Sequence, residues 1–260
     1  MRIDSYLYTH CGGQSHNEDC AASRTDAGSS LFVLADGLGG CLGGEEASRH
    51  VVETILAAWE QYQKGNGRQE ETPTYRNYME TCMAECILKA NTSLIQLQKA
   101  LHKRMKSTVV TLAVQKDSAV WANVGDSRLY YLTQGHIFQL TQDHSVTYKK
   151  YQSGEISKAQ IARDEDRSSL LRVVGDAKRC IPDCGTLEFP LRSGDAFLLC
   201  SDGFWEYLSE EEILIERLKA ETAKEWIEGM MLRLMERILP DTDNLTALTV
   251  IFTAEDAKED

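Results

Sequence analysis

The segment Leu31-Phe32-Val33-Leu34-Ala35-Asp36-Gly37 leads from an uninterrupted apolar run directly into an acidic turn. A short apolar run with β-branched and aromatic residues predicts a buried β-strand, and Asp-Gly predicts the turn that ends it. The pattern returns in Ala196-Phe197-Leu198-Leu199-Cys200-Ser201, which is followed by Asp202-Gly203. We therefore expect two strands that each end in an aspartate.

Further strands and helices are predicted in separate groups along the chain. The short β-like runs are residues 109–114, 119–124, 129–132 and 246–252, with a hairpin loop at 115–118. The helical patterns are residues 46–63 and 75–101, separated by a loop at 64–74, and two helices that follow capping boxes at Ser209 and Thr222. Grouped strands and paired helices favour an α+β fold over regular β-α-β alternation. Since no linker is evident, we expect one domain over residues 1–254 and an acidic tail at 255–260.

The composition excludes several classes of protein. The chain of 260 residues is 42% apolar and 26% charged, which is typical of a globular protein and argues against disorder. Its 28 basic and 40 acidic side chains give a net charge of -12, which disfavours nucleic-acid binding through phosphate contacts. No apolar run approaches the ~20 residues that span a bilayer, and the first residues lack a signal-peptide pattern. We therefore expect a cytoplasmic protein with no membrane or nucleic-acid partner.

The cysteines allow two interpretations. Among the 8 cysteines, Cys82/Cys86 and Cys180/Cys184 form C-x3-C pairs that could in principle supply zinc ligands. Cys82 and Cys86, however, fall on the apolar stripe of a predicted helix, where small apolar side chains belong. Buried, reduced thiols are the preferred interpretation, and a zinc site is the alternative.

Aspartates also stand at other predicted strand junctions. The full set is Asp36, Asp126, Asp202 and Asp243. Because strand ends in stacked sheets can lie side by side, these side chains could converge on a small volume. Clustered carboxylates repel one another unless a cation neutralises them, and oxygen ligands with nearby glycine carbonyls suit Mg²⁺ or Mn²⁺. The pattern thus predicts a site for a hard divalent ion.

The glycine-rich segment at residues 37–44 precedes a predicted helix and could cradle a phosphate. It lacks the Gly-Lys-Ser/Thr ending of a P-loop and the spacing of a dinucleotide fingerprint. A tight turn whose backbone approaches a metal ion is the better interpretation. The chain also has neither a G-x-S-x-G nucleophile elbow nor an H-E-x-x-H pair.

These features belong to an ordered set of motifs. In chain order the set is Asn17-Glu18-Asp19, Asp36-Gly37-Leu38-Gly39-Gly40, Gly125-Asp126-Ser127-Arg128, Leu140-Thr141-Gln142-Asp143-His144-Ser145, Ser201-Asp202-Gly203 and Asp243-Asn244. Over nearly its whole length the chain resembles the metal-dependent Ser/Thr protein phosphatases, the PPM or type 2C family, in their compact bacterial form. The resemblance implies a four-layer α-β-β-α sandwich of two antiparallel sheets flanked by helix pairs, with a flap at about residues 146–170.

The resemblance also implies a role for each matching residue. It implies two Mn²⁺ or Mg²⁺ ions, bridged by the carboxylate of Asp36. The implied metal ligands are Asp36, the Gly37 carbonyl, Asp202 and Asp243, with Asp126 joining Asp202 at a third metal site. Glu18 and Asp19 would hydrogen-bond metal-bound waters from behind these ligands.

Three departures from the family pattern concern the chemistry of the phosphate. Gln14 stands where the family usually has an arginine that binds the substrate phosphate, and Leu38 stands where eukaryotic members often have a histidine proposed as general acid. Lys106 replaces the glycine of a Met-Gly-Thr-Thr segment. Since a glutamine has neither charge nor a guanidinium fork, we expect weaker phosphate affinity. We also expect a nearby cation, Lys106 or an arginine of the flap, to replace the missing arginine in part.

With these features, the resemblance implies a phosphoprotein phosphatase that hydrolyses phosphoserine and phosphothreonine with a metal-activated water and without a phosphoenzyme. Its expected partners are phosphorylated proteins in signal transduction, opposite a Ser/Thr kinase, and we expect a monomer. A catalytically weak module of the same fold that binds phosphoproteins is the alternative. A metal-binding regulatory protein without phosphate chemistry is a third interpretation.

Overall fold

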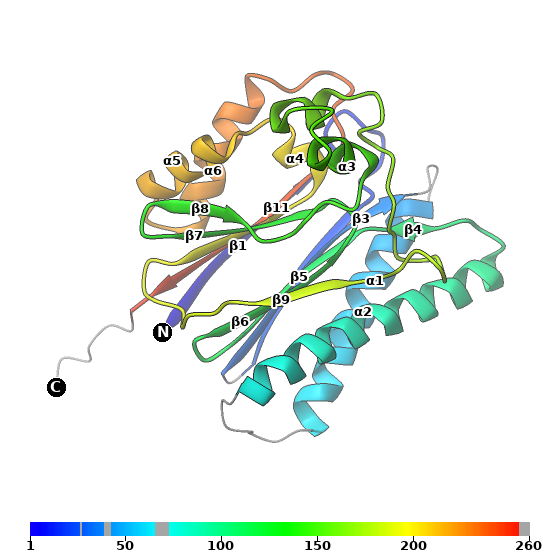
Figure 1. Cartoon of the computed structure of the whole chain (residues 1–260), viewed down its shortest axis with the longest axis horizontal. Coiled ribbons are helices and arrows are strands. Elements are labelled where there is room, and N and C mark those ends of the chain that lie inside the picture. Colours follow the sequence, from blue (N-terminus) through cyan, green and yellow to red (C-terminus); the bar gives the residue numbers. More distant parts are fainter. Residues whose placement is uncertain (27, 39–42, 66–72, 255–260) are drawn as a thin grey trace.

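The computed structural model describes residues 1–26, 28–38, 43–65 and 73–254. Two β-sheets pack face to face, and helices cover the outer face of each sheet (Figure 1). The predictions of an α+β fold and of a four-layer α-β-β-α sandwich are therefore confirmed. The expected acidic tail at 255–260 lies outside the described residues.

The first sheet has five strands in the order β1-β11-β10-β7-β8. The strands are β1 (Arg2–His10), β7 (Arg128–Thr133), β8 (His136–Gln139), β10 (Ala196–Cys200) and β11 (Leu245–Thr253). Every neighbouring pair is antiparallel. Because β11 lies between β1 and β10, the first and last strands of the chain pair with each other (Figure 1).

The second sheet follows the order β2-β3-β5-β6-β9, and β4 pairs with β3 beside this path. The strands are β2 (Asp19–Asp26), β3 (Ser29–Leu38), β4 (Lys106–Ser107), β5 (Val109–Gln115), β6 (Ser118–Val124) and β9 (Asp183–Thr186). The predicted hairpin joins β5 to β6, with Gln115 opposite Ser118. Its turn places Lys116 at a positive φ of 54°.

The predicted helices form two pairs, one on each sheet. The long helices α1 (Gly43–Gly65) and α2 (Pro73–Leu101) cover the second sheet, and α5 (Glu210–Lys219) and α6 (Ala223–Met235) cover the first. The capping boxes at Ser209 and Thr222 both form. Shorter helices are α3 (Val146–Gln152), η1 (Lys158–Arg163) and α4 (Asp202–Trp205). In the described part of the chain, no helix is long and apolar enough to cross a membrane.

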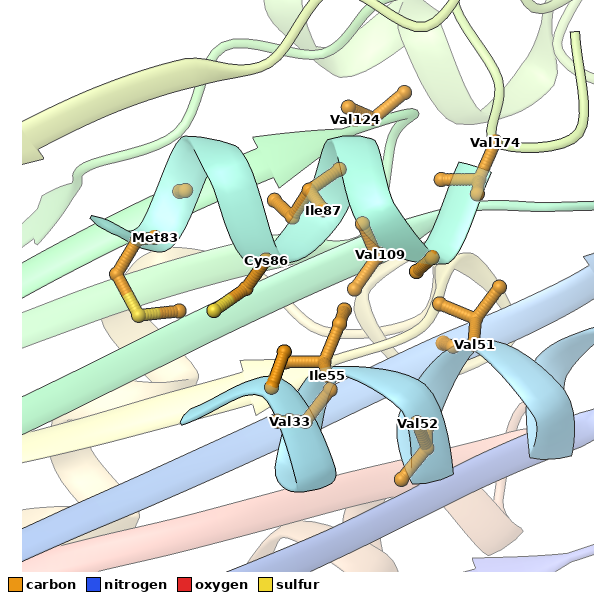
Figure 2. Packing of buried hydrophobic residues seen from close by; sticks show 14 of the residues in the cluster. Val33, Val51, Val52, Ile55, Met83, Cys86, Ile87, Val109, Val124 and Val174 are labelled. Carbon is orange, nitrogen blue, oxygen red and sulfur yellow. The ribbon is translucent and has the colours of Figure 1, made fainter. Parts of the chain in front are cut away.

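Alternate residues of β3 face two different parts of the core. Leu31, Val33 and Ala35 pack with α1 and α2, whereas Phe32 and Leu34 pack between the sheets. Figure 2 shows Val33 in the first of these clusters, together with side chains from both helices. Each buried leucine, valine or phenylalanine contributes about 1.5–3 kcal/mol relative to an exposed one. Burial on both faces explains why this strand is apolar throughout.

Candidate metal centre

The strand-end aspartates converge at one end of the sandwich. They border a pocket of about 190 Å³. Its lining residues are Glu18, Asp36, Gly37, Leu38, Asp126, Ser168, Leu170, Asp202, Asp243 and Asn244. Asp19 is buried and lies opposite Asp36 in the β2–β3 ladder. The structure therefore brings together all the acidic residues singled out in the sequence.

Each aspartate is placed by a strand or by the turn next to it. Asp36 lies near the end of β3, and Asp126 follows Gly125, which turns the chain out of β6 at a φ of 109°. Asp202 is the first residue of α4, directly after β10 and Ser201. Asp243 precedes β11, the antiparallel neighbour of β10. The two sheets thus contribute carboxylates from opposite walls of one pocket.

Burial and mutual repulsion disfavour negative charge on these side chains. Burial, and then the neighbouring Asp19 and Asp202, raise the pKa of Asp36 well above its usual value. Burial and Asp202 likewise raise the pKa of Asp126. Burial and Asp243 raise the pKa of Asp202 to about 6, and burial raises that of Asp19 to about 7. Such a cluster is stable in its ionised form only when cations neutralise it.

The donor atoms fit hard divalent cations. The pocket offers carboxylate oxygens and the backbone at Gly37, the donor type that Mg²⁺ and Mn²⁺ prefer. Asp19 Oδ1 is buried, and no hydrogen-bond partner for it is found among the described residues. Within those same residues, no three histidine, cysteine, aspartate or glutamate side chains alone form a metal cage. Ions held here would therefore take further ligands from backbone carbonyls and water, as Mg²⁺ usually does.

The glycines beside the pocket allow backbone segments to approach closely. A Cβ on Gly37 would lie 2.0 Å from the carbonyl oxygen of Gly44, and a Cβ on Gly44 would lie 2.4 Å from the carboxyl group of Glu18. Neither position can therefore accept a side chain without movement of the backbone or of Glu18. The tight turn expected here is consistent with these contacts, although residues 39–42 of the glycine-rich segment lie outside the described residues.

Hydrogen bonds hold three acidic residues of the site, Glu18, Asp19 and Asp243. Ser201 Oγ donates to Asp19 Oδ2 at 2.8 Å. The backbone amide of Glu18 donates to Asn244 Oδ1 at 2.6 Å, and the backbone amide of Asn244 donates to Asp243 Oδ1 at 2.8 Å. Burial, followed by the charge of Asp243, raises the pKa of Glu18. The carboxylate of Asp19 and the backbone of Glu18 are thus held by residues distant in the sequence.

A buried arginine supports the wall that carries Asp126. The guanidinium of Arg128 donates to Asp143 at 2.6 Å and stacks 3.4 Å from the ring centroid of Trp205. Trp205 Nε1 in turn donates to the backbone carbonyl of Asp126 at 3.1 Å. Arg128 thus forms a buried ion pair with Asp143 and, through Trp205, supports the backbone of Asp126.

Sequence reasoning missed Trp205 and Glu206. Burial, followed by the charge of Asp202, raises the pKa of Glu206 to about 8. Its position four residues after Asp202, at the C-cap of α4, is the sequence signal that could have drawn attention to it.

Two predicted phosphate ligands lie outside the pocket lining. Gln14 is exposed, and its Nε2 donates to the carbonyl of Asp241 at 3.2 Å. Lys106 Nζ lies 3.5 Å from Asp176 Oδ2, in an ion pair beside β4. The structure does not bring either side chain to the carboxylate cluster, and their roles in phosphate binding stay predictions.

Three of the four cysteines in the C-x3-C pairs are buried. Cys82, Cys86 and Cys180 are buried among apolar side chains, and Cys184 is exposed on β9. No cluster of metal-binding side chains includes them within the described residues. The burial of Cys82, Cys86 and Cys180 among apolar side chains is consistent with core thiols.

Known proteins share both the sequence pattern and the fold. The sequence profile of the family Protein phosphatase 2C matches residues 8–242. The serine/threonine phosphatase stp of Listeria monocytogenes is 31% identical over 200 residues, 76% of either chain. The crystal structure of the serine/threonine phosphatase Stp1 from Staphylococcus aureus superposes with a TM-score of 0.80 at 27% identity, and the match covers 98% of this chain and 96% of that one. The catalytic domain of the phosphatase PstP, solved with 2 manganese ions, has a TM-score of 0.76 at 22% identity over 97% and 99% of the two chains.

The chain therefore belongs to the protein phosphatase 2C family. The predicted family and the predicted class of enzyme, a serine/threonine protein phosphatase, are both confirmed. None of these relatives favours the alternative of a catalytically weak binding module.

Proposed function

We propose that the chain hydrolyses phosphoserine and phosphothreonine in proteins at a centre of two Mn²⁺ or Mg²⁺ ions. The convergence of Asp36, Asp126, Asp202 and Asp243 on one pocket is the observation that carries this proposal. The PstP catalytic domain, a structural relative, was solved with 2 manganese ions, which supports the choice of metal.

Asp36, the Gly37 carbonyl, Asp202 and Asp243 would hold the two ions, and Asp126 with Asp202 would hold a third. When bound, such ions supply the positive charge that makes water a stronger acid and that neutralises phosphoryl oxygens in the transition state. The chain itself contributes fixed carboxylates, because Ser201 orients Asp19 and Asn244 holds the backbone of Glu18. In this proposal Glu18 and Asp19 would accept hydrogen bonds from metal-bound water.

The raised pKa values of the thiols argue against a covalent intermediate in which a cysteine carries the phosphoryl group. Burial raises the pKa of each thiol in the following set: Cys20, Cys82, Cys86, Cys180, Cys184 and Cys200. A nucleophilic thiolate needs the opposite shift. Leu38, which lines the pocket, has no proton to give, so the departing serine or threonine oxygen must take its proton from water or from another group.

The cellular setting is part of the same proposal. We infer that the chain works as a cytoplasmic monomer in signal transduction and reverses the action of a Ser/Thr kinase. The seven cysteines that the structure describes are free, which is typical of a reducing compartment.

The proposed function is tested by phosphate release from a phosphothreonine peptide with and without Mn²⁺. We expect metal-dependent turnover that falls at least about 10³-fold in Asp36→Asn and Asp202→Asn. Asp117→Asn, in the β5–β6 turn, is the matched control and should retain full activity. Binding of the peptide without turnover would support the binding module instead.

A further inference from the structure

We propose that His144 is a positioning residue of the metal centre, because its imidazole holds the backbone of Gly125 and thereby directs the carboxylate of Asp126 into the pocket. His144 belongs to the sequence motif at residues 140–145, which by itself assigns no role to the histidine. The inference rests on the proposed function, in which Asp126 is a ligand of the third ion.

His144 holds the Gly125 turn by two hydrogen bonds. The amide of Gly125 donates to Nδ1 of the imidazole at 3.1 Å, and the backbone amide of His144 donates to the carbonyl of Gly125 at 2.9 Å. Both polar groups of Gly125 are therefore bonded to one residue, at the φ of 109° where the chain leaves β6. Because Asp126 is the next residue and lines the pocket, the direction of its side chain depends on this turn.

The other nitrogen of the imidazole fixes the orientation of the ring. Since Nδ1 accepts a hydrogen bond, the neutral ring carries its proton on Nε2, which lies 3.0 Å from Asp183 Oδ2. Burial lowers the pKa of His144, in agreement with a neutral ring. The guanidinium of Arg172 donates to Asp183 Oδ1 at 2.5 Å and so holds that carboxylate in place. A carboxylate on one nitrogen thus keeps the other nitrogen directed at Gly125.

The backbone that carries the ring is also held. The carbonyl of His144 accepts a hydrogen bond from the amide of Leu171 at 2.7 Å. The next residue, Ser145, forms an isolated β-bridge with Leu170, which lines the pocket. The imidazole is therefore attached to a fixed segment of chain, as a positioning residue requires.

Two further contacts hold the turn by groups other than the Gly125 amide. Trp205 Nε1 donates to the carbonyl of Asp126 at 3.1 Å, and Ser127 Oγ shares a hydrogen bond with Thr108 Oγ1 at 2.8 Å. Loss of the imidazole bond should therefore loosen the turn without unfolding it. A loosened turn holds the carboxylate of Asp126 less precisely, so the expected effect is on metal affinity.

Two substitutions separate the two hydrogen bonds of the imidazole. The side-chain oxygen of asparagine occupies the place of Nδ1, so His144→Asn retains an acceptor for the Gly125 amide. The side-chain amide of glutamine reaches the place of Nε2, so His144→Gln retains a donor beside Asp183 and leaves the Gly125 amide unpaired. His50→Gln is the matched control, since His50 shares a hydrogen bond with Ser93 between α1 and α2.

Calorimetry of Mn²⁺ binding is the first readout. We expect His144→Gln to weaken, by at least about tenfold, the binding step that Asp126→Asn abolishes, because groups that orient a metal ligand contribute this much to affinity. His144→Asn and His50→Gln should bind Mn²⁺ as the parent does. In the double variant Asp126→Asn/His144→Gln the histidine change should have no further effect, because it acts through Asp126.

Hydrogen exchange of the Gly125 amide in the metal-free protein is the second readout, and it depends on neither metal nor turnover. Exchange should be faster in His144→Gln than in the parent, and it should remain slow in His144→Asn.

Asp183→Ala provides the test if His144→Gln does not fold, since this position is half-exposed. Without the carboxylate, Arg172 Nη1, which lies 3.0 Å from Nε2, becomes the partner of that nitrogen. Arginine can only donate, so the ring proton moves to Nδ1 and faces the Gly125 amide. We expect faster exchange of that amide and weaker Mn²⁺ binding in this variant as well.

Equal losses of Mn²⁺ affinity in His144→Asn and His144→Gln would overturn the proposal, since the bond to Gly125 would then not matter. Parental Mn²⁺ binding in His144→Gln, or in Asp183→Ala where that variant replaces it, would also overturn it. If Mn²⁺ binding depends on His144 as expected but the parent releases no phosphate from a phosphothreonine peptide, the proposed function fails and this inference stands. Mn²⁺-dependent turnover together with parental Mn²⁺ binding in His144→Gln would give the reverse.

Discussion

Asn244 Oδ1 accepts a hydrogen bond from the backbone amide of Glu18 at 2.6 Å and so joins residues 226 positions apart. The amide group of the same side chain donates to the carbonyls of Cys11 and His16, each at 3.0 Å. Since Glu18 and Asp243 both line the pocket, Asn244 fixes the N-terminal and C-terminal walls of the site relative to each other.

We expect Asn244→Ala to reduce both stability and activity. The change removes an acceptor and two donors from a buried position, so the free energy of unfolding should fall by about 1–3 kcal/mol. Release of Glu18 should also lower kcat/KM at least tenfold. Urea unfolding and peptide dephosphorylation measure the two effects, with Gln61→Ala at an exposed position of α1 as control. Unchanged activity in Asn244→Ala would show that the position of Glu18 is not limiting.

The buried pair of Arg128 and Asp143 gives a second prediction. Arg128→Met leaves the carboxylate of Asp143 buried without its partner, and should destabilise the protein by about 3–5 kcal/mol. The double variant Arg128→Met/Asp143→Leu removes both charges and should recover part of this loss. Chemical denaturation of the parent, the two single variants and the double variant gives the double-mutant cycle that measures the coupling of the pair. Simple additivity of the single losses would contradict this account.

The sequence predicts the central strands of this fold well because they are buried on both faces. The apolar runs of β3 and β10 are recognisable as buried strands from the sequence alone. β1 and β2 contain many polar residues and are only partly buried, so their sequences carry no comparable signal. The pairing of β1 with β11 joins strands near the two ends of the chain, and no local sequence pattern predicts it.

The acidic residues of the site were predictable because each stands next to a strand. The bond from Trp205 to the Asp126 carbonyl was not, since it depends on how α4 packs below the turn after β6. Lys106 was expected near the phosphate because it replaces a glycine in a segment of the family pattern. Its side chain lies beside Asp176, and its role in phosphate binding stays a prediction. Side-chain direction of this kind is set by tertiary contacts, and no motif encodes it.

The carboxylate cluster predicts an unusual effect of mutation on stability. Asp36→Asn removes one charge from a group that burial and neighbouring aspartates disfavour. In the absence of metal we expect the variant to be more stable than the parent by about 1–3 kcal/mol. Addition of Mn²⁺ should raise the Tm of the parent and leave that of the variant nearly unchanged. Scanning calorimetry with and without chelator measures this, and a metal-free variant less stable than its parent would contradict it.

Acid should weaken the contact between α5 and the end of α6 in a defined pH range. The hydrogen bond from Arg237 lowers the pKa of Glu212 from its ordinary 4.5 to about 2. Because the pKa is lower in the folded protein, the contribution of Glu212 is present above pH 4.5 and is lost as the pH falls towards 2.

Glu212→Gln should therefore lower Tm by a few °C at pH 7, and by clearly less at pH 3. Thermal unfolding at both pH values gives the difference, and the exposed Glu221→Gln provides the control. An equal loss at the two pH values would mean that Glu212 contributes through packing rather than through charge.

The most direct test of the central claim is anomalous diffraction at the manganese edge from crystals grown with Mn²⁺. The account predicts two strong peaks in the pocket, within ligand distance of Asp36, Asp202 and Asp243, and their loss in crystals of Asp36→Asn. Peaks elsewhere on the molecule, with none between these carboxylates, would contradict the assignment of the pocket as the metal centre.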